Sequence, residues 1–561
     1  MAQAFKGLFI QIPFGQENRV IFLLAGSACL ELFAYMAGGY VARLAAMIWI
    51  AQSLLAALCV SYWYVENLLN AWNKKQFPFL ITHSIILCIL TFVLGSPQIA
   101  DVSPEAALQA GAGIDAFSSI DFNYNGKAFL GYPARQYLLV ALPSKLFGSS
   151  LFALHLGFAW LFIIGFMAFS VGLQRLTARL GRPESLALVP ISLLFSFPFI
   201  PEYYLIFEQT ILPISLTLFA IGIVLIALDE FSPAALIALA WVSAFLSHTY
   251  TPALAALGLL LVSLLLLCLK PSQMDMNLDR HQLKKVFLAI FGYAVIFLLA
   301  TVLAGREDRV AQLRESSSAF DLLTSVLAVL TDRNVAFFGV LDLPILAYLI
   351  ASLLGFFGRI HFLVSVWVIG VLMAALQLQG YTQYDVASIM QRALIILPVL
   401  LTAMYLIFLR WMASNSVGLS GRSACVIALS ALIVLFSNVL HEHRSFRYLN
   451  SIVPFKFILN DMNADIKKMG VEQPKQVDIL FFTDNQLMTN LKDYARYLFP
   501  AAHVYVSTDK AIPNEVANSK NLLIYGDESI AGGIAGLQLQ AVGVKDVRTG
   551  AQVKYYRGRV E

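Results

Sequence analysis

The stretch that decides the fold is residues 131–158, GYPARQYLLVALPSKLFGSSLFALHLGF. Its first half, up to Phe147, is apolar and aromatic and carries two basic side chains, Arg135 and Lys145. That length and pattern predict a helix that lies in the membrane interface. After Gly148 a new apolar run begins, and its length predicts a helix that crosses the bilayer. The stretch therefore predicts a chain that follows the membrane surface and then enters the membrane.

The composition of the whole chain agrees with this interpretation. Of its 561 residues, 59% are hydrophobic and 13% are charged, whereas soluble domains carry about 25% charged residues. A soluble enzyme, a disordered chain and a coiled coil are therefore excluded. The formal net charge is +4, and the basic residues lie in short loops without a basic stripe. Nucleic acid is therefore not expected as a partner.

Long apolar runs follow one another over most of the chain. A helix needs about 20 mostly apolar residues to cross the hydrocarbon core, and the sequence predicts about thirteen such spans by this criterion. The fold class is therefore a polytopic α-helical membrane protein. The spans are expected near residues 18–38, 43–65, 78–96, 151–173, 186–201, 207–228, 232–249, 251–269, 285–304, 336–357, 361–379, 390–410 and 422–440.

Basic residues follow the second, fourth, eighth, tenth and twelfth spans, which orients the bundle. Cytoplasmic loops carry an excess of lysine and arginine, so these loops and the N-terminus are expected on the cytoplasmic side. The basic residues concerned are Lys74, Lys75, Arg175, Arg179, Arg182, Lys270, Arg280, Lys284, Lys285, Arg359, Arg410 and Arg422. The opposite, extracytoplasmic face then holds the loops 97–150 and 305–335 and the tail. Span count and loop charge favour the bacterial inner (plasma) membrane.

The tail is expected to be a second domain, because the apolar fraction falls and the charge rises from about residue 441. We assign residues 1–440 to the transmembrane domain and 441–561 to a soluble periplasmic domain. Apolar strands alternate there with a helix, which is typical of a small α/β sheet. Strands are expected at 477–482, 503–508 and 521–526, a helix at 485–499, and a closing hairpin in the last residues. The domain has no glycine-rich nucleotide fingerprint.

Acidic residues on the extracytoplasmic face are candidates for catalysis. Asp101, Asp115 and Asp121 lie in the first large loop, where a carboxylate at the membrane surface can act as general base on an acceptor hydroxyl. A solvated carboxylate or a helix cap is the alternative for each of them. Glu202, Glu208 and His248 lie on the same face and are candidates for acceptor binding or a second acidic group. Glu208 alternatively lies at a helix start, where the helix dipole favours negative charge.

Arginines on the same face are candidates for phosphate binding. Arg392 lies a few residues inside an apolar run, where a cation is costly unless it has a partner, and guanidinium groups bind phosphate well. Arg135 and Arg306 are further candidates. Arg306 belongs to a mixed-charge loop, whose alternative role is a solvated surface. No set of metal ligands is evident, so no metal site is predicted, although the acidic residues would permit a divalent cation.

Three segments together resemble the GT-C superfamily of membrane glycosyltransferases, which use polyprenyl-phosphate-linked sugar donors. Members place an acidic residue just beyond a membrane span, and IAD with Asp101 is similar. Some thirty residues later they carry an interfacial helix, a "lfG" segment and a new span, as 131–158 does here. An arginine leading into a late span with a proline is similar to QRALIILP (391–398). A C-terminal extracytoplasmic α/β domain also recurs, as in the lipid A aminoarabinose transferases; the protein mannosyltransferases share the layout.

This resemblance implies transfer of a sugar from a polyprenyl-phosphate-linked donor to an extracytoplasmic glycan, lipid or protein, with membrane lipids around the enzyme. It implies an inverting direct displacement with an aspartate as general base. Val102 follows Asp101 where members often have a second acidic residue, so the choice among the three aspartates stays open. Two alternatives are a transporter or flippase of a lipid-linked or anionic substrate and an O-antigen polymerase or ligase.

Overall fold

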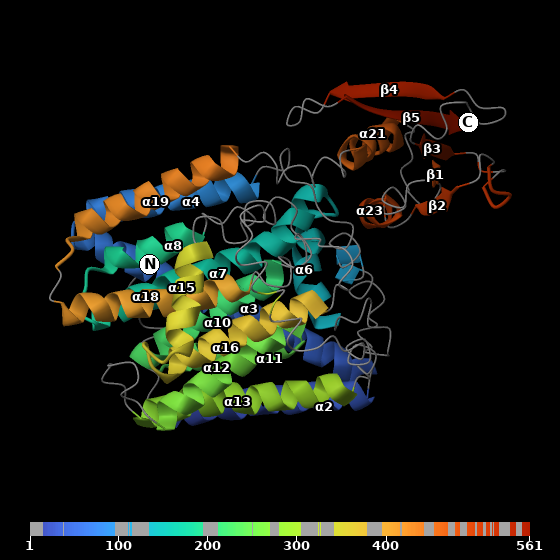
Figure 1. Cartoon of the computed structure of the whole chain (residues 1–561). Helices are drawn as coiled ribbons and strands as arrows, with labels where there is room; N and C mark the ends of the chain where they lie inside the picture. The colour runs from blue at the N-terminus through green and yellow to red at the C-terminus, as the bar shows by residue number, and fades with distance from the viewer. Residues whose placement is uncertain are drawn as a thin grey trace.

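The chain forms a bundle of long helices followed by a small sheet (Figure 1). The computed structural model describes residues 15–37, 39–95, 110–111, 113–114, 134–194, 211–248, 251–269, 280–303, 324, 326, 342–377, 395–415, 418–441, 454–468, 477–482, 491–499, 502–508, 512–516, 519, 521–526, 539–545 and 552–560. The bundle consists of α2 (Gly15–Ala37), α3 (Gly39–Asn73), α4 (Phe77–Gly95), α6 (Ala134–Phe147), α7 (Leu151–Arg179), η1 (Glu184–Ala187), α8 (Leu188–Leu194), α10 (Ile211–Asp229), α11 (Pro233–His248), α12 (Thr251–Leu269), α13 (Arg280–Leu303), α15 (Asp342–Leu353), α16 (Arg359–Gln377), α18 (Ile396–Ser414) and α19 (Gly421–His441).

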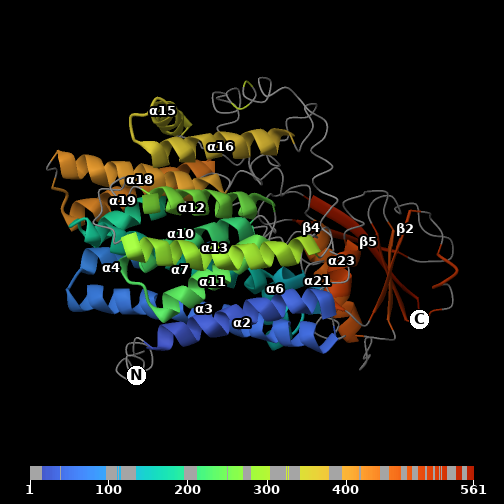
Figure 2. The same ribbon diagram turned by 90° about the horizontal axis from the view of Figure 1, so that it is seen from below.

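A described helix overlaps each of the predicted spans, but the number of spans is not confirmed. Among the described residues, five helices are long and apolar enough to cross a membrane, which makes the chain a multi-pass membrane protein by length and composition. These helices are Arg43–Asn73, Phe152–Arg179, Leu212–Asp229, Arg280–Leu299 and Ile396–Ser414. The tenth predicted span is described as a helix only over the 12 residues of α15, and this helix lies across the direction of α16 in both views (Figures 1 and 2).

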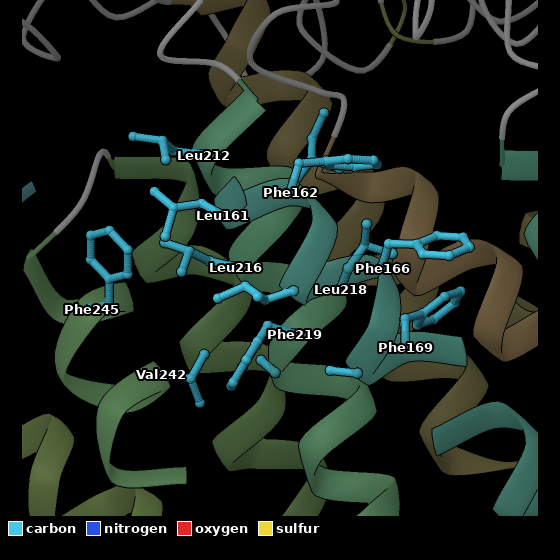
Figure 3. Close-up of a cluster of buried hydrophobic side chains, with 14 of the residues drawn as sticks. Leu161, Phe162, Phe166, Phe169, Leu212, Leu216, Leu218, Phe219, Val242 and Phe245 are labelled. Carbon is cyan, nitrogen blue, oxygen red and sulfur yellow. The ribbon is translucent and has the colours of Figure 1, made fainter. Parts of the chain in front are cut away.

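Helices α7 and α10 pack backbone against backbone at the centre of the bundle. A Cβ atom on Gly222 would lie 2.2 Å from the carbonyl carbon of Ala168, and one on Gly165 would lie 2.3 Å from the carbonyl oxygen of Ser215. Only glycine permits this approach. Large apolar side chains of α7, α10 and α11 surround the contact and are buried, as Figure 3 shows for Phe162, Phe219 and Phe245. Dense packing of this kind makes α7 and α10 the rigid centre of the bundle.

Basic loops gather at one end of the bundle, as the loop charges predict. Arg182 donates a hydrogen bond to the carbonyl oxygen of Met412 at 3.0 Å, which joins the loop after α7 to the end of α18. The ammonium of Lys74, just after α3, pairs with Glu184 at 3.0 Å. Arg179 donates to the carbonyl oxygen of Leu228 at 2.7 Å, at the end of α10. We call this the basic end.

The C-terminal residues form a five-stranded mixed sheet with strand order β2-β1-β3-β5-β4. Strands β1 (Asp478–Phe482), β2 (His503–Ser507) and β3 (Leu522–Gly526) are parallel, and β5 (Gln552–Val560) and β4 (Gln540–Lys545) form an antiparallel pair beside them. Two helices, α21 (Pro454–Lys468) and α23 (Leu491–Leu498), accompany the sheet. The predicted strands, helix and closing hairpin are all present. We call residues 454–560 the C-terminal unit.

The C-terminal unit lies beyond the end of the bundle opposite the basic end (Figures 1 and 2). Part of its buried core, with Leu459, Tyr494 and Tyr497, is continuous with the hydrophobic core of the bundle, whereas Leu480, Phe482, Val516, Leu522 and Ile524 form a separate cluster. The unit therefore rests on the membrane helices through a packed contact. We call the end of the bundle that it covers the capped end.

Candidate functional site

The candidate site is the capped end of the bundle, because the described helices that flank the candidate segments end or begin there. Helix α4 ends at Gly95 before the first large loop, and α10 begins at Ile211 after the segment with Glu202 and Glu208. Helix α13 ends at Leu303 before Arg306, and α18 begins at Ile396 after Arg392. These ends are opposite to the loops that carry Arg182 and Lys74. The described helices that flank the acidic and arginine-bearing segments thus end or begin at a single end of the bundle.

Most of the predicted site residues lie outside the described residues. This holds for the three aspartates Asp101, Asp115 and Asp121, and for Glu202, Glu208, Arg306 and Arg392. Two candidates are described at the level of the backbone. His248 is the last residue of α11, and Arg135 is the second residue of α6. Both helix ends lie at the capped end, as the sequence predicts.

Helix α6 is present where the sequence predicts it, but its surroundings differ from the prediction. A helix lying in the interface would expose one face to lipid, whereas Leu138, Leu139 and Val140 are buried in protein. The reason is a close approach to α7, since a Cβ atom on Gly157 would lie 2.2 Å from the carbonyl oxygen of Val140. Among the side chains described in α6, which begin at Leu138, the exposed ones are those at its far end, Lys145, Leu146 and Phe147. Helix α6 is therefore part of the bundle.

The corner between α6 and α7 is built from GSS (148–150). Gly148 has φ +83°, in the left-handed region that favours glycine, so it can end α6. Ser150 then caps α7, because its hydroxyl accepts a hydrogen bond from the backbone N–H of Ala153 at 3.1 Å. The "lfG" segment thus has a physical role, which is to fix the direction in which α7 enters the bundle.

The C-terminal unit is fastened to this corner by one tyrosine. The hydroxyl of Tyr497, on α23, lies 2.7 Å from the hydroxyl of Ser144 on α6 and donates to the carbonyl oxygen of Ser150 at 2.9 Å. Burial raises the pKa of Tyr497 to about 12, so the phenol stays protonated and available as a donor. The two hydrogen bonds hold α23 directly over the α6–α7 corner.

A second polar cluster joins α21 to the sheet within the C-terminal unit. Arg557 on β5 pairs with Asp461 at 3.1 Å, and the hydroxyl of Tyr555 donates to the same carboxylate at 2.5 Å. The hydroxyl of Tyr525 donates to Asp465 at 2.9 Å. Burial and the neighbouring carboxylate raise the pKa of Tyr525 far above its usual range. Both carboxylates of α21 therefore have partners on the sheet, and these contacts fix α21 in place.

Two buried ionisable residues near the capped end were missed in the sequence. Glu31 is buried in the second half of α2, and His155 is buried in the second turn of α7. Both take part in polar or electrostatic interactions. A charged residue inside an apolar run, such as Glu31 in CLELF, indicates a candidate functional residue, because burial of an ionisable group in a membrane segment is costly. Among the described residues no group of three metal-ligating side chains occurs.

Comparison with known proteins gives matches among solved structures at low sequence identity. No family model and no curated protein matches the chain. Its structure is similar to that of ArnT from Cupriavidus metallidurans bound to undecaprenyl phosphate, with 11% identity and a TM-score of 0.48 over 85% of this chain and 97% of ArnT. It is also similar to an Archaeoglobus fulgidus oligosaccharyltransferase in the apo form, with 12% identity and a TM-score of 0.42 over 82% and 70% of the two chains.

Both solved proteins are GT-C fold glycosyltransferases, the class that the sequence resembles. ArnT in its apo state gives the same TM-score, 0.48, at 12% identity. All these TM-scores are below 0.5, at sequence identities of 11% and 12%.

Proposed function

We propose that the protein is an integral membrane glycosyltransferase that moves a sugar from a polyprenyl-phosphate-linked donor to an extracytoplasmic glycan, lipid or protein. The observation that carries the proposal is the convergence of helix ends at the capped end. The segments with the candidate carboxylates and the candidate phosphate-binding arginines all flank these ends. A lipid-linked donor has its phosphate at the membrane surface and its hydrocarbon in the bilayer, so one membrane face must supply both kinds of group.

The proposed reaction is a direct, inverting displacement. One loop aspartate, Asp101, Asp115 or Asp121, takes the proton of the acceptor hydroxyl as its oxygen attacks the anomeric carbon. The bond between that carbon and the donor phosphate oxygen breaks, and the electron pair stays on the phosphate. Arg392, with Arg135 or Arg306, stabilises the negative charge of this leaving group. The acceptor then carries the sugar, and polyprenyl phosphate remains.

We further propose that the basic end faces the cytoplasm and that the C-terminal unit is periplasmic, in a bacterial inner membrane. Lysine and arginine in short loops favour the cytoplasmic side, and these residues gather at the basic end. Alkaline phosphatase fused after Glu561 is expected to be active, and a fluorescent protein inserted in the loop after Asn415 is expected to fold. The opposite pattern would invert the proposed topology.

The function is tested on the lipids that copurify with the protein in detergent. We expect mass spectrometry to find a polyprenyl phosphate, with or without its sugar, on the wild type, and to find it at least 10-fold reduced in Arg392→Ala. Arg422→Ala is the matched control, because Arg422 is an exposed arginine at the basic end. The mass of an attached sugar would identify the donor.

Two results would contradict the proposal. Ordinary phospholipid alone, at equal levels in wild type and both variants, would remove the role of Arg392. Export of a lipid-linked substrate by reconstituted protein, without any glycosidic bond being formed, would support a transporter instead.

A further inference from the structure

We propose that the bundle holds an anionic phospholipid from the leaflet at its basic end, with the head group of the lipid at the end of the bundle opposite the candidate glycosyltransferase site. The groove is a cavity of about 140 Å³ between α10, α12, α16 and α18. Its walls are almost entirely apolar, with Val224, Leu260 and Leu406 as typical members. A hydrocarbon chain is the ligand for which such walls are suited, because they offer it burial and few hydrogen bonds.

The groove runs along the bundle and reaches the basic end; toward the capped end it is lined by Leu246, Ala256 and Val399, in the last turn of α11 and the first turns of α12 and α18. On α16 it is lined by Ile360, His361 and Val364, in the first turns of that helix, and on α10 and α12 it reaches Leu228 and Leu267 in their last turns. The indole N–H of Trp367 donates to the carbonyl oxygen of Ala255 at 2.9 Å, which holds α16 beside α12. Two of the helices that line the groove are therefore joined by a hydrogen bond, which fixes their relative position.

Cationic and polar groups surround the groove where it meets the basic end. Half-buried His361 lines it directly, and the hydroxyl of Tyr348 lies 3.3 Å from His361 Nδ1. Arg410, exposed on the last turns of α18, is close enough to act electrostatically on His361. Arg359 is the first residue of α16 and precedes the groove residue Ile360. An apolar groove with arginines at its mouth is complementary to a lipid with a negatively charged head group.

The position of this mouth distinguishes the ligand from the proposed donor. The donor phosphate would lie at the capped end, whereas Arg359 and Arg410 lie near the opposite end of α16 and α18. Lipid-facing side chains on the same two helices, Phe362 and Val366 among them, are exposed beside the groove. An acyl chain can therefore pass from the bilayer into the groove while its phosphate stays at the arginines. The inference does not depend on the proposed transferase activity.

The test uses the full chain, delipidated in detergent and studied by native mass spectrometry. The probes are palmitoyl-oleoyl phosphatidylglycerol and palmitoyl-oleoyl phosphatidylcholine, which share acyl chains and differ in head-group charge. We expect one phosphatidylglycerol to bind at least 5-fold more tightly than phosphatidylcholine. The double variant Arg359→Gln/Arg410→Gln should lose this preference, and Ser263→Leu, which fills the groove, should weaken the binding of both lipids.

The controls distinguish a specific lipid-binding site from nonspecific electrostatic attraction of anionic lipid to the basic end. Arg422→Gln removes a basic-end arginine outside the groove and should keep the full preference. A loss of preference in Arg422→Gln equal to that in the double variant would overturn the proposal, as would equal binding of the two lipids by the wild type. Displacement of phosphatidylglycerol by equimolar undecaprenyl phosphate would show that the groove holds the donor's tail instead. A melting curve of each variant without lipid verifies that it is folded.

Discussion

The two ends of the bundle are built on different principles. At the basic end, arginines and lysines meet carbonyl oxygens and carboxylates across short loops, as with Arg182 and Met412 or Lys74 and Glu184. At the capped end, the helices that flank the candidate catalytic segments end or begin, and the C-terminal unit is held over the α6–α7 corner through Tyr497. The difference shows that short ion-paired loops close one end of the bundle, whereas a separately folded unit packs against the other.

The largest effect is expected at the capped end. Replacing the base among Asp101, Asp115 and Asp121 by asparagine should lower the transfer rate by about 10²–10⁴-fold, which is the usual contribution of general acid–base catalysis. The measurement is transfer of radiolabelled sugar from a polyprenyl-phosphate donor in membranes, with the three variants made singly. Full activity in all three variants would exclude an aspartate base in this loop.

The next effect is expected in the centre that connects the two ends. Gly222→Ala should destabilise the protein by about 3 kcal/mol, since overpacking against a rigid backbone is costly, and the new Cβ would lie 2.2 Å from the carbonyl carbon of Ala168. Thermal unfolding in detergent measures this. Gly258→Ala is the matched control, because a Cβ there meets nothing within 4 Å. Equal melting temperatures of the two variants would contradict the close α7–α10 packing.

A smaller effect is expected from the tyrosine that fastens the C-terminal unit. Tyr497→Phe removes two hydrogen bonds, each with a net contribution of about 0.5–1.5 kcal/mol, and should loosen the unit without unfolding the bundle. Hydrogen exchange of α6 and α23 should accelerate, and limited proteolysis before α21 should be faster. Tyr505→Phe, in β2, is the control. Unchanged exchange at α6 in Tyr497→Phe would mean that apolar packing alone holds the unit.

The smallest effect is expected at the basic end. Lys74 has a side-chain exposure of 57%, and exposed ion pairs contribute about 0–1 kcal/mol. A double-mutant cycle with Lys74→Gln and Glu184→Gln, followed by thermal unfolding, should give a coupling energy in that range, lower still at high salt. A coupling energy well above about 1 kcal/mol would show that this ion pair stabilises the protein more than its exposure predicts.

Much of the fold could be predicted because apolar runs and strand patterns are local signals. The run before Lys74 predicts α3, and VDILFF predicts β1 without knowledge of the rest of the chain. The burial of α6 could not be predicted in the same way. YPARQYLLVALPSKLF has the composition of an interfacial helix, and only the glycine of α7 that approaches Val140 brings it inside the protein.

Less of the candidate site could be predicted, for a related reason. The convergence of its flanking helices follows from loop charge, which fixes the side of each loop. The contact between Tyr497 and Ser144 joins residues 353 positions apart, and no local pattern marks either of them. Glu31 did carry a signal, as a lone acid in an apolar run, but the signal does not say what the residue contacts.

The distance along the chain between Ser144 and Tyr497 has a consequence for biosynthesis. A ribosome adds roughly 5–20 residues per second, so the 353 residues between them take about 20 to 70 s to make. During this time α6 and α7 have already been made, while the segment that covers their corner has not yet been translated. The newborn protein therefore passes through a long-lived stage with an uncovered corner. Chaperones or proteases on that face of the membrane have their best opportunity to act on the chain at this stage.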